Sequence, residues 1–133
     1  MACPLGSSMT SAKRQSALVV DDDPVTRIRI ITRGLLNYFG FEVSTLNDGI
    51  EVVNMYEAGK GHFDLIITDM EMPVMNGIEA TKKLRSLGVG CKIIGVSSCD
   101  DETSRRHFME AGLDHLFYKP LNVTKLQSCL ENN

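Results

Sequence analysis

The chain has 133 residues, with 14 basic and 17 acidic side chains, a net charge of −3 and 43% hydrophobic residues. This length suits one domain, and a folded chain of this size buries roughly two thirds of its unfolded surface. The balance argues against a disordered chain, a collagen-like repeat and a dominant nucleic-acid footprint. No apolar run approaches the ~18 residues that a membrane span needs.

The cysteines and the N-terminal residues indicate a reduced, intracellular protein, and we expect it in the cytoplasm, with the nucleus as a second compartment. The first 15 residues lack the apolar stretch of a secretory signal. The first residues are rich in glycine and serine and resemble a cloning remnant ahead of a native start near Met9. We expect residues 1–15 to form a disordered tail and residues 16–131 to form the domain. The four cysteines form no C-x-x-C pair and share no metal-ligand spacing with the histidines: Cys3, Cys91, Cys99 and Cys129.

Five short β-rich segments alternate with segments of helical spacing. Consecutive apolar residues, such as Leu18-Val19-Val20, suit strands buried on both faces. The first helical segment repeats apolar residues at Ile28, Ile31 and Leu35. The expected strands, in chain order, are Ala17–Val20, Glu42–Leu46, Asp64–Thr68, Lys92–Val96 and His115–Tyr118.

Boundary residues agree with this alternation. Gly40 and Gly112 follow helical segments, where glycine commonly ends a helix. Ser98, with Asp101 three residues later, resembles an N-terminal capping box. Strands that alternate with helices predict right-handed βαβ units, and therefore a doubly wound α/β fold with a five-stranded parallel sheet.

Polar residues of interest directly follow the first, third, fourth and fifth expected strands. Asp21-Asp22-Asp23 follow the first, Asp69 the third, Ser97 the fourth and Lys119 the fifth. Because ligands of open α/β sheets bind beyond the carboxyl ends of the strands, we expect these side chains to converge at one end of the sheet.

Such a set has a chemical purpose. Clustered carboxylates repel one another unless a cation neutralises them, and Mg²⁺ prefers one or two carboxylates together with phosphate oxygens. A carboxylate beside that metal can attack a phosphoryl group and form an aspartyl phosphate. The metal and a lysine would offset the charge on the phosphoryl oxygens, and a serine hydroxyl that bonds such an oxygen would act as a switch.

These residues resemble the receiver domain of two-component response regulators, over roughly residues 16–131. The resemblance implies a flavodoxin-like (βα)5 fold with strand order 2-1-3-4-5. The runs that carry it are Val19-Val20-Asp21-Asp22-Asp23-Pro24, Asp64-Leu65-Ile66-Ile67-Thr68-Asp69-Met70-Glu71-Met72-Pro73 with Gly77, Val96-Ser97-Ser98 and Lys119-Pro120.

The resemblance also implies roles for individual residues. Asp69 is implied to be the phospho-acceptor and to contact the metal, Ser97 the switch hydroxyl and Lys119 the phosphoryl clamp, with a cis Lys119–Pro120 bond. The cofactor is Mg²⁺, with Mn²⁺ as a substitute. Its implied ligands are Asp22 directly, Asp21 through water, Asp69 and the backbone carbonyl of Glu71.

Leu116 departs from the usual pattern of receivers, and two further positions leave a question open. Leu116, three residues before the lysine, stands where receivers often have an aromatic gate, with Phe117 and Tyr118 beside it. Glu71 and Cys99 occupy positions that tune the lifetime of the phosphate, and the sequence leaves the direction open.

The motif run is most similar to plant-type single-domain response regulators. We therefore expect a monomeric signalling protein, not an enzyme, that assists its own phosphotransfer and autodephosphorylation and serves as a phosphorelay switch or phosphate sink. The expected partner is a histidine-phosphotransfer protein or a histidine kinase, with no nucleic acid and no membrane. The receiver stands alone or comes from a larger protein.

Two alternatives stay open at this stage. One is a binding module that keeps the receiver fold and never takes phosphate. The other is a haloacid-dehalogenase-like phosphatase with Asp21 as nucleophile, because Asp21-Asp22-Asp23-Pro24-Val25 fits the D-x-D-x-[TV] pattern. That family needs a later acidic pair for Mg²⁺, and Glu131 is the sole acid after Lys119.

Overall fold

The computed structural model describes residues 15–22 and 27–131, without the side chains of 27–29. The expected tail, apart from Gln15, therefore lies outside the described residues, as does Asp23.

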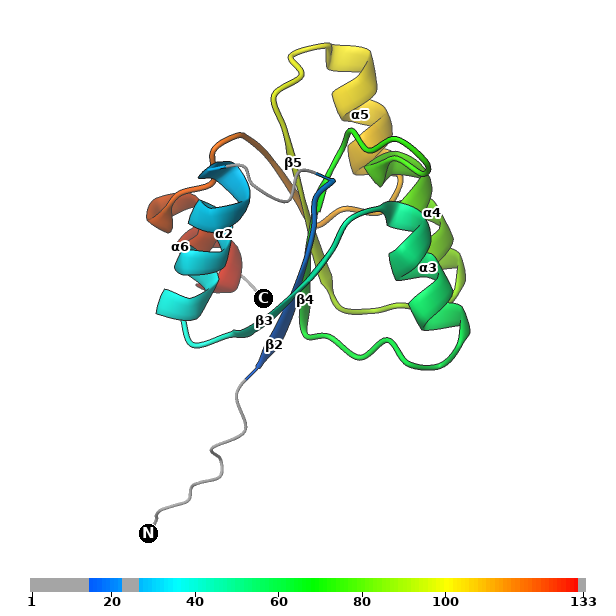
Figure 1. Ribbon diagram of the computed structural model, residues 1–133. Coiled ribbons are helices and arrows are strands. Elements are labelled where there is room, and N and C mark those ends of the chain that lie inside the picture. The colour runs from blue at the N-terminus through cyan, green and yellow to red at the C-terminus, as the bar shows by residue number, and fades with distance from the viewer. Residues whose placement is uncertain (1–14, 23–26, 132–133) are drawn as a thin grey trace, which may run out of the picture.

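Five parallel strands form one sheet in the order β3-β2-β4-β5-β6 (Figure 1). This is the order 2-1-3-4-5 that the resemblance implied. All five predicted strands are confirmed, each within one residue at either end. They are β2 Ser16–Val20, β3 Glu42–Leu46, β4 Leu65–Asp69, β5 Lys92–Ser97 and β6 His115–Tyr118.

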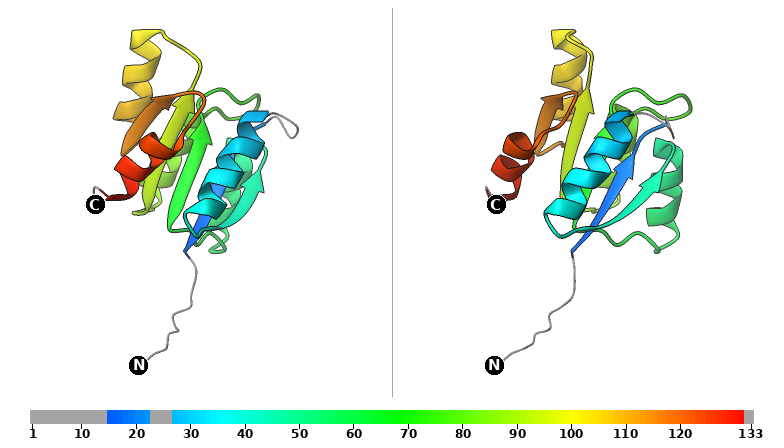
Figure 2. Two further views of the ribbon diagram at one scale, coloured as in Figure 1. Left: turned by 90° about the vertical axis from the view of Figure 1, so that its left-hand side faces the viewer. Right: turned by 60° about the vertical axis from the view of Figure 1, so that its left-hand side comes forward.

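The connections between the strands are helical. Helices α2 and α6 cover one face of the sheet, and α3, α4 and α5 cover the other (Figures 1 and 2). No helix in the described part of the chain is long and apolar enough to cross a membrane. The helices of the described residues are α2 Arg27–Tyr38, α3 Gly49–Glu57, α4 Gly77–Ser86, α5 Glu102–Glu110 and α6 Val123–Glu131.

Both faces of the sheet are buried, because alternate residues of each central strand enter different cores. In β2, Leu18 and Val20 pack with α3, α4 and α5, whereas Ala17 and Val19 pack with α2 and α6. Successive side chains of the strand point to opposite faces, and these four are all apolar because helices cover both faces of this parallel sheet.

The ends of the helices follow the sequence signals with one correction. Gly40 and Gly112 have positive φ angles of 90° and 124°, which glycine adopts without strain. The predicted capping box at Ser98 is wrong. Asp101 itself is the N-cap of α5, and its carboxylate accepts a hydrogen bond from the Ser104 N–H. A carboxylate accepts this bond well, and its charge favours the N-terminal end of the helix.

Candidate functional site

Three carboxylates meet at the carboxyl end of the sheet. Val20 pairs with Thr68 across β2 and β4, so Asp21, which follows β2, is level with Asp69, the last residue of β4. Oxygen atoms of Asp21, Asp22 and Asp69 lie within 4.8 Å of one another. Asp21 and Asp69 are buried, whereas Asp22 is exposed. Three negative charges so close together favour a bound cation.

Lys119 contacts this cluster from the end of β6. Its Nζ donates a hydrogen bond to Asp69 Oδ2 over 2.9 Å, and the two side chains are 14% and 5% exposed. Burial raises the pKa of the Asp69 carboxyl. The Lys119 ammonium and the Glu71 N–H act to lower this pKa, and the Asp21 carboxylate raises it further, so the net direction is upward. The lysine therefore offsets the negative charge only in part.

Ser97 lies on the neighbouring strand β5, fully buried at its last position. Its Oγ accepts a hydrogen bond from the Cys99 N–H over 2.9 Å. Its carbonyl accepts the Lys119 N–H over 3.0 Å. As an acceptor in the Cys99 bond, the hydroxyl can donate its own proton to an oxygen that binds beside it. The Lys119–Pro120 peptide bond is cis, as the resemblance implied.

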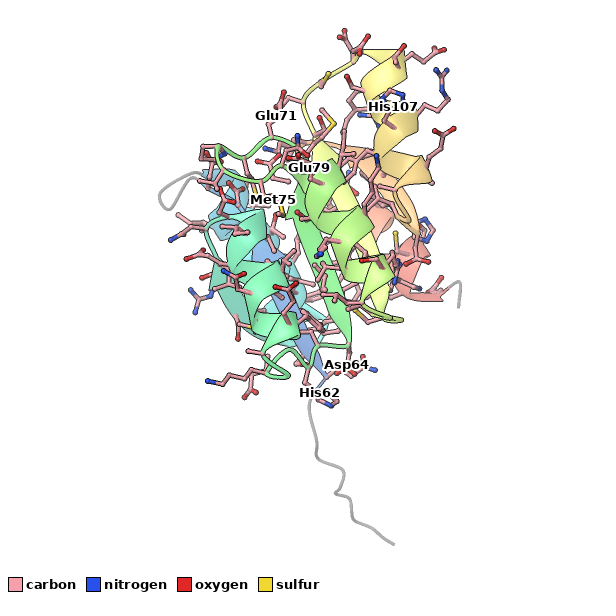
Figure 3. The ribbon with its side chains drawn as sticks, turned by 90° about the vertical axis from the view of Figure 1, so that its right-hand side faces the viewer. His62, Asp64, Glu71, Met75, Glu79 and His107 are labelled. Atoms are coloured by element: carbon pink, nitrogen blue, oxygen red, sulfur yellow. The ribbon has the colours of Figure 1, made fainter. Side chains whose placement is uncertain are left out.

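Glu71 is the second residue of the loop between β4 and α4, at the same end of the molecule as the carboxylates (Figure 3). Its side chain is exposed, and its N–H donates to Asp69 Oδ1 over 3.3 Å. The loop ends at Gly77, whose N–H donates to the Met70 carbonyl over 2.7 Å. A Cβ at Gly77 would overlap the Asp69 carbonyl oxygen, so glycine allows this close approach.

The structure thus brings Asp21, Asp22, Asp69 and Lys119 together, with Ser97 on the adjacent strand. The usual gate position is occupied by Leu116, which is half-buried and packs against the core that α3, α4 and α5 cover.

The aromatic ring exposed on β6 belongs instead to Tyr118, which is 48% exposed. The Arg105 guanidinium carbon lies 3.8 Å from the centre of that ring. Arg105 Nη1 also donates to the Cys99 carbonyl over 3.1 Å. A cation from α5 therefore holds the ring of Tyr118 and the loop after Ser97 together.

The sequence interpretation missed Asp48, a buried carboxylate that caps α3. The pattern Asp48-Gly-Ile-Glu51 is the signal that could have found the cap, because an acid at the N-cap followed three residues later by Glu is typical of a capping box. Its further partners come from the loop after β4 and carry no sequence signal.

Comparisons with known proteins agree with the geometry. The model of the response regulator receiver domain matches residues 17–131. Two relatives from Arabidopsis thaliana are Two-component response regulator 24, 46% identical over 115 residues (86% of this chain, 81% of the relative), and Two-component response regulator ARR22, 41% identical over 112 residues (84% and 78%).

A solved structure shows the same fold. It is the receiver domain of sensor histidine kinase PA1611 from Pseudomonas aeruginosa PAO1, crystallised with a magnesium ion in its active site cleft. The TM-score is 0.76 at 28% identity, over 90% of this chain and 96% of that one. The family match across nearly the whole described chain and the plant relatives agree on one assignment. The chain belongs to the response regulator receiver family.

Proposed function

We propose that this chain accepts a phosphoryl group from a phosphohistidine donor onto Asp69, in a Mg²⁺-dependent reaction, with residues 16–131 as the receiver unit. It would act as a switch or a phosphate sink in a phosphorelay. Phosphorylation on aspartate is the general mechanism of the family. The observation that carries the proposal is the placement of Asp69, which bonds Lys119 and lies within 4.8 Å of Asp21 and Asp22.

The donor set fits Mg²⁺. Carboxylate oxygens are the hard ligands that this ion prefers. Burial, with a smaller contribution from Asp21, raises the pKa of Asp69, so a bound cation would favour its charged form. Asp22 would bind the ion directly and Asp21 through water, with Asp69 and the Glu71 carbonyl as further ligands, and Mn²⁺ would substitute. When bound, the ion would neutralise the carboxylates and the phosphoryl oxygens.

The chain's own residues would carry the transfer. A carboxylate oxygen of Asp69 forms the new bond to phosphorus as the phosphorus–nitrogen bond of the donor breaks. The donor imidazole keeps that electron pair. Lys119 then stabilises the phosphoryl oxygens through its ammonium group. The Ser97 hydroxyl donates a hydrogen bond to one of these oxygens, which links phosphorylation to the loop that follows β5.

Return to the unphosphorylated state would be hydrolysis of the acyl phosphate, with water attacking phosphorus and Asp69 leaving as carboxylate. The exposed side chain of Glu71 and the half-buried Cys99 stand near this site on the two flanking loops. They are the side chains we propose to set the rate at which water reaches the phosphate.

The partner would be a histidine-phosphotransfer protein or a histidine kinase, the classes with which receiver domains interact. We propose that a helical partner that presents phosphohistidine to Asp69 packs against the rim of the site near α2. Ile30, in the first turn of α2, is 65% exposed and offers an apolar contact there. The similarity to two plant response regulators supports a plant-type phosphorelay.

The test is phosphorylation measured by Phos-tag electrophoresis. Acetyl phosphate and a phosphorylated histidine-phosphotransfer protein serve as donors, each with and without Mg²⁺. We expect a shifted band that needs Mg²⁺, disappears in Asp69→Asn and persists in the matched control Asp64→Asn. Asp64 is an exposed acid at the opposite end of the sheet (Figure 3). The absence of an Asp69-dependent band would leave the non-phosphorylated binding module as the better assignment.

The phosphatase alternative has its own test. In a dehalogenase-like site the lysine would serve Asp21, whereas Lys119 here bonds Asp69. Sustained hydrolysis of p-nitrophenyl phosphate that is lost in Asp21→Asn and retained in Asp69→Asn would overturn the proposal.

A further inference from the structure

Asp48 is a buried carboxylate outside the cluster at Asp69. It lies between β3 and α3 and is 7% exposed. Its Oδ1 accepts hydrogen bonds from the Ile50 N–H over 3.1 Å and the Met75 N–H over 2.9 Å. Its Oδ2 accepts the Val74 N–H over 3.0 Å. One bond belongs to the helix that Asp48 caps, and two reach residues 26 and 27 positions away in the loop after β4.

The surroundings of Asp48 fix it firmly. Glu51 Oε1 accepts the N–H groups of Asn47 and Asp48, which closes the capping box of α3. Gly49 lies against the same loop, since a Cβ there would be 2.5 Å from the Met75 carbonyl oxygen and 2.9 Å from the Ala80 Cβ. Asp48 therefore accepts N–H groups of the loop, and Gly49 lies close to one of the loop's carbonyl oxygens.

The clamped loop is the one that leaves the phospho-acceptor. Its near end is fixed at Met70, whose N–H donates to the Val96 carbonyl over 3.0 Å and whose carbonyl accepts the Gly77 N–H. Its far end is fixed at residues 74 and 75 by Asp48. Glu71 lies between the two anchors, and its N–H already contacts Asp69 Oδ1. Figure 3 shows Glu71 and Met75 at this end of the molecule, toward the start of α4.

We propose that Asp48 is a positioning residue for the phosphorylation site: it holds the loop between β4 and α4, and with it the Glu71 main chain, at the rim of the carboxylate cluster. This role rests on the proposed function of Asp69. Only a carboxylate can accept all of these bonds, because an amide has one acceptor oxygen and would turn an N–H₂ group toward an N–H. A serine can cap α3 but is too short to bond Val74 and Met75 as well.

The test is the affinity for Mn²⁺, measured on the full chain by electron paramagnetic resonance, together with the amide resonances of residues 71–75. We expect Asp48→Ser to weaken Mn²⁺ binding about tenfold, the size typical of groups that orient metal ligands, and to shift those resonances. Asp48→Asn should have a smaller effect in the same direction and serves if the serine variant does not fold.

The matched control is Asp101→Ser. It removes the same charge from another N-cap at the same end of the sheet, and its carboxylate bonds only within its own helix, to Ser104. We expect Asp101→Ser to bind Mn²⁺ nearly as tightly as the unmodified chain. Repeating the titration at high salt removes the long-range effect of the lost charge, since the screening length falls to about 3 Å at 1 M.

Two outcomes would overturn the positioning role. One is unchanged Mn²⁺ affinity in folded Asp48→Ser, and the other is an equal loss in Asp101→Ser. Failure of the proposed function looks different. In that case the unmodified chain takes no phosphoryl group on Asp69, while the two variants still differ in Mn²⁺ affinity if Asp48 positions the loop.

Discussion

Replacing Asp69 with asparagine should stabilise the metal-free protein. The substitution removes one charge from a cluster of three carboxylates and keeps nearly the same shape. The pKa of Asp69 is raised, first by burial and then by Asp21, against the lowering effect of Lys119. A raised pKa means that the folded protein disfavours the charged form, so the folded state gains free energy when that charge is absent.

The magnitude follows from opposing contributions. With an effective dielectric constant of about 20, Coulomb's law gives roughly 6 kcal/mol of attraction to Lys119 at 2.9 Å. Asp21 lies within 4.8 Å, so its repulsion is at least about 3.5 kcal/mol. Asp22 is exposed, and solvent screens its repulsion. Removing the charged Asp69 carboxylate from water costs several kcal/mol. This cost exceeds the attraction to Lys119 that is left after the repulsion from Asp21 is subtracted. We expect Asp69→Asn to raise the free energy of unfolding by about 1 kcal/mol, the size of a typical single-site effect.

The pH dependence has a definite sign. An acid whose pKa is raised on folding contributes stability that is present below its unfolded pKa and is lost as the pH rises through the folded value. The stability difference between Asp69→Asn and the unmodified chain should therefore be near zero below the ordinary Asp value of 3.8. It should grow as the pH rises above that value and level off once the pH exceeds the raised folded pKa.

Urea unfolding in EDTA, at acidic and neutral pH, measures this difference. Adding Mg²⁺ should reverse the order, because a ligand at 100 times its Kd stabilises the protein that binds it by about 2.7 kcal/mol and the Asp69→Asn variant would bind the ion more weakly. A metal-free Asp69→Asn variant that is less stable than the unmodified chain at pH 7 would refute the charge balance described above.

Three further predictions concern residues at and beyond the site. Lys119→Met should reduce the rate of Asp69 phosphorylation at least tenfold, since it removes the ammonium 2.9 Å from Asp69 Oδ2, and Phos-tag time courses with acetyl phosphate would show this. Ile30→Asp should slow transfer from a phosphorylated histidine-phosphotransfer protein and leave the rate with acetyl phosphate unchanged; equal slowing with both donors would contradict a docking role. Arg85→Met should lower the free energy of urea unfolding by about 2–3 kcal/mol with unchanged phosphorylation, because it removes hydrogen bonds to three carbonyls and to Asp114.

The strands and the carboxylate cluster could be predicted from the sequence because their signals are local. A strand that is buried on both faces is apolar along its length, and the consecutive apolar residues Leu65-Ile66-Ile67 are typical of such a strand. Once the strands are parallel, the acids that follow β2 and end β4 must meet at one edge. The bond between Lys119 and Asp69, 50 residues apart, follows from that topology together with the lengths of the side chains.

The contacts of Asp48 and Asp101 could not be predicted in the same way. The N–H groups of Val74 and Met75 are main-chain atoms, and every residue type except proline offers them, so the sequence carries no mark of their partner. The choice between Ser98 and Asp101 as the cap of α5 depends on where the chain leaves β5. Helix boundaries shift by a residue or two for such reasons.

Two buried carboxylates at the same end of this fold have pKa values shifted in opposite directions. Burial alone would raise the pKa of Asp48, but hydrogen bonds from the N–H groups of Ile50, Val74, Met75 and Gly49 lower it below the usual value. Its stabilising contribution is therefore present above the unfolded pKa and is lost as the pH falls through the lower folded value. The pKa of Asp69 shifts in the opposite sense, because burial raises it first and the Asp21 carboxylate raises it further, against the lowering effects of Lys119 and the Glu71 N–H. A buried carboxylate that accepts several main-chain N–H groups stabilises the folded structure. A buried carboxylate whose charged form is disfavoured, as at Asp69, can bind a cation or react with a phosphoryl group. The loop between β4 and α4 thus joins the carboxylate of Asp48, which the main chain satisfies, to the proposed phosphorylation site at Asp69.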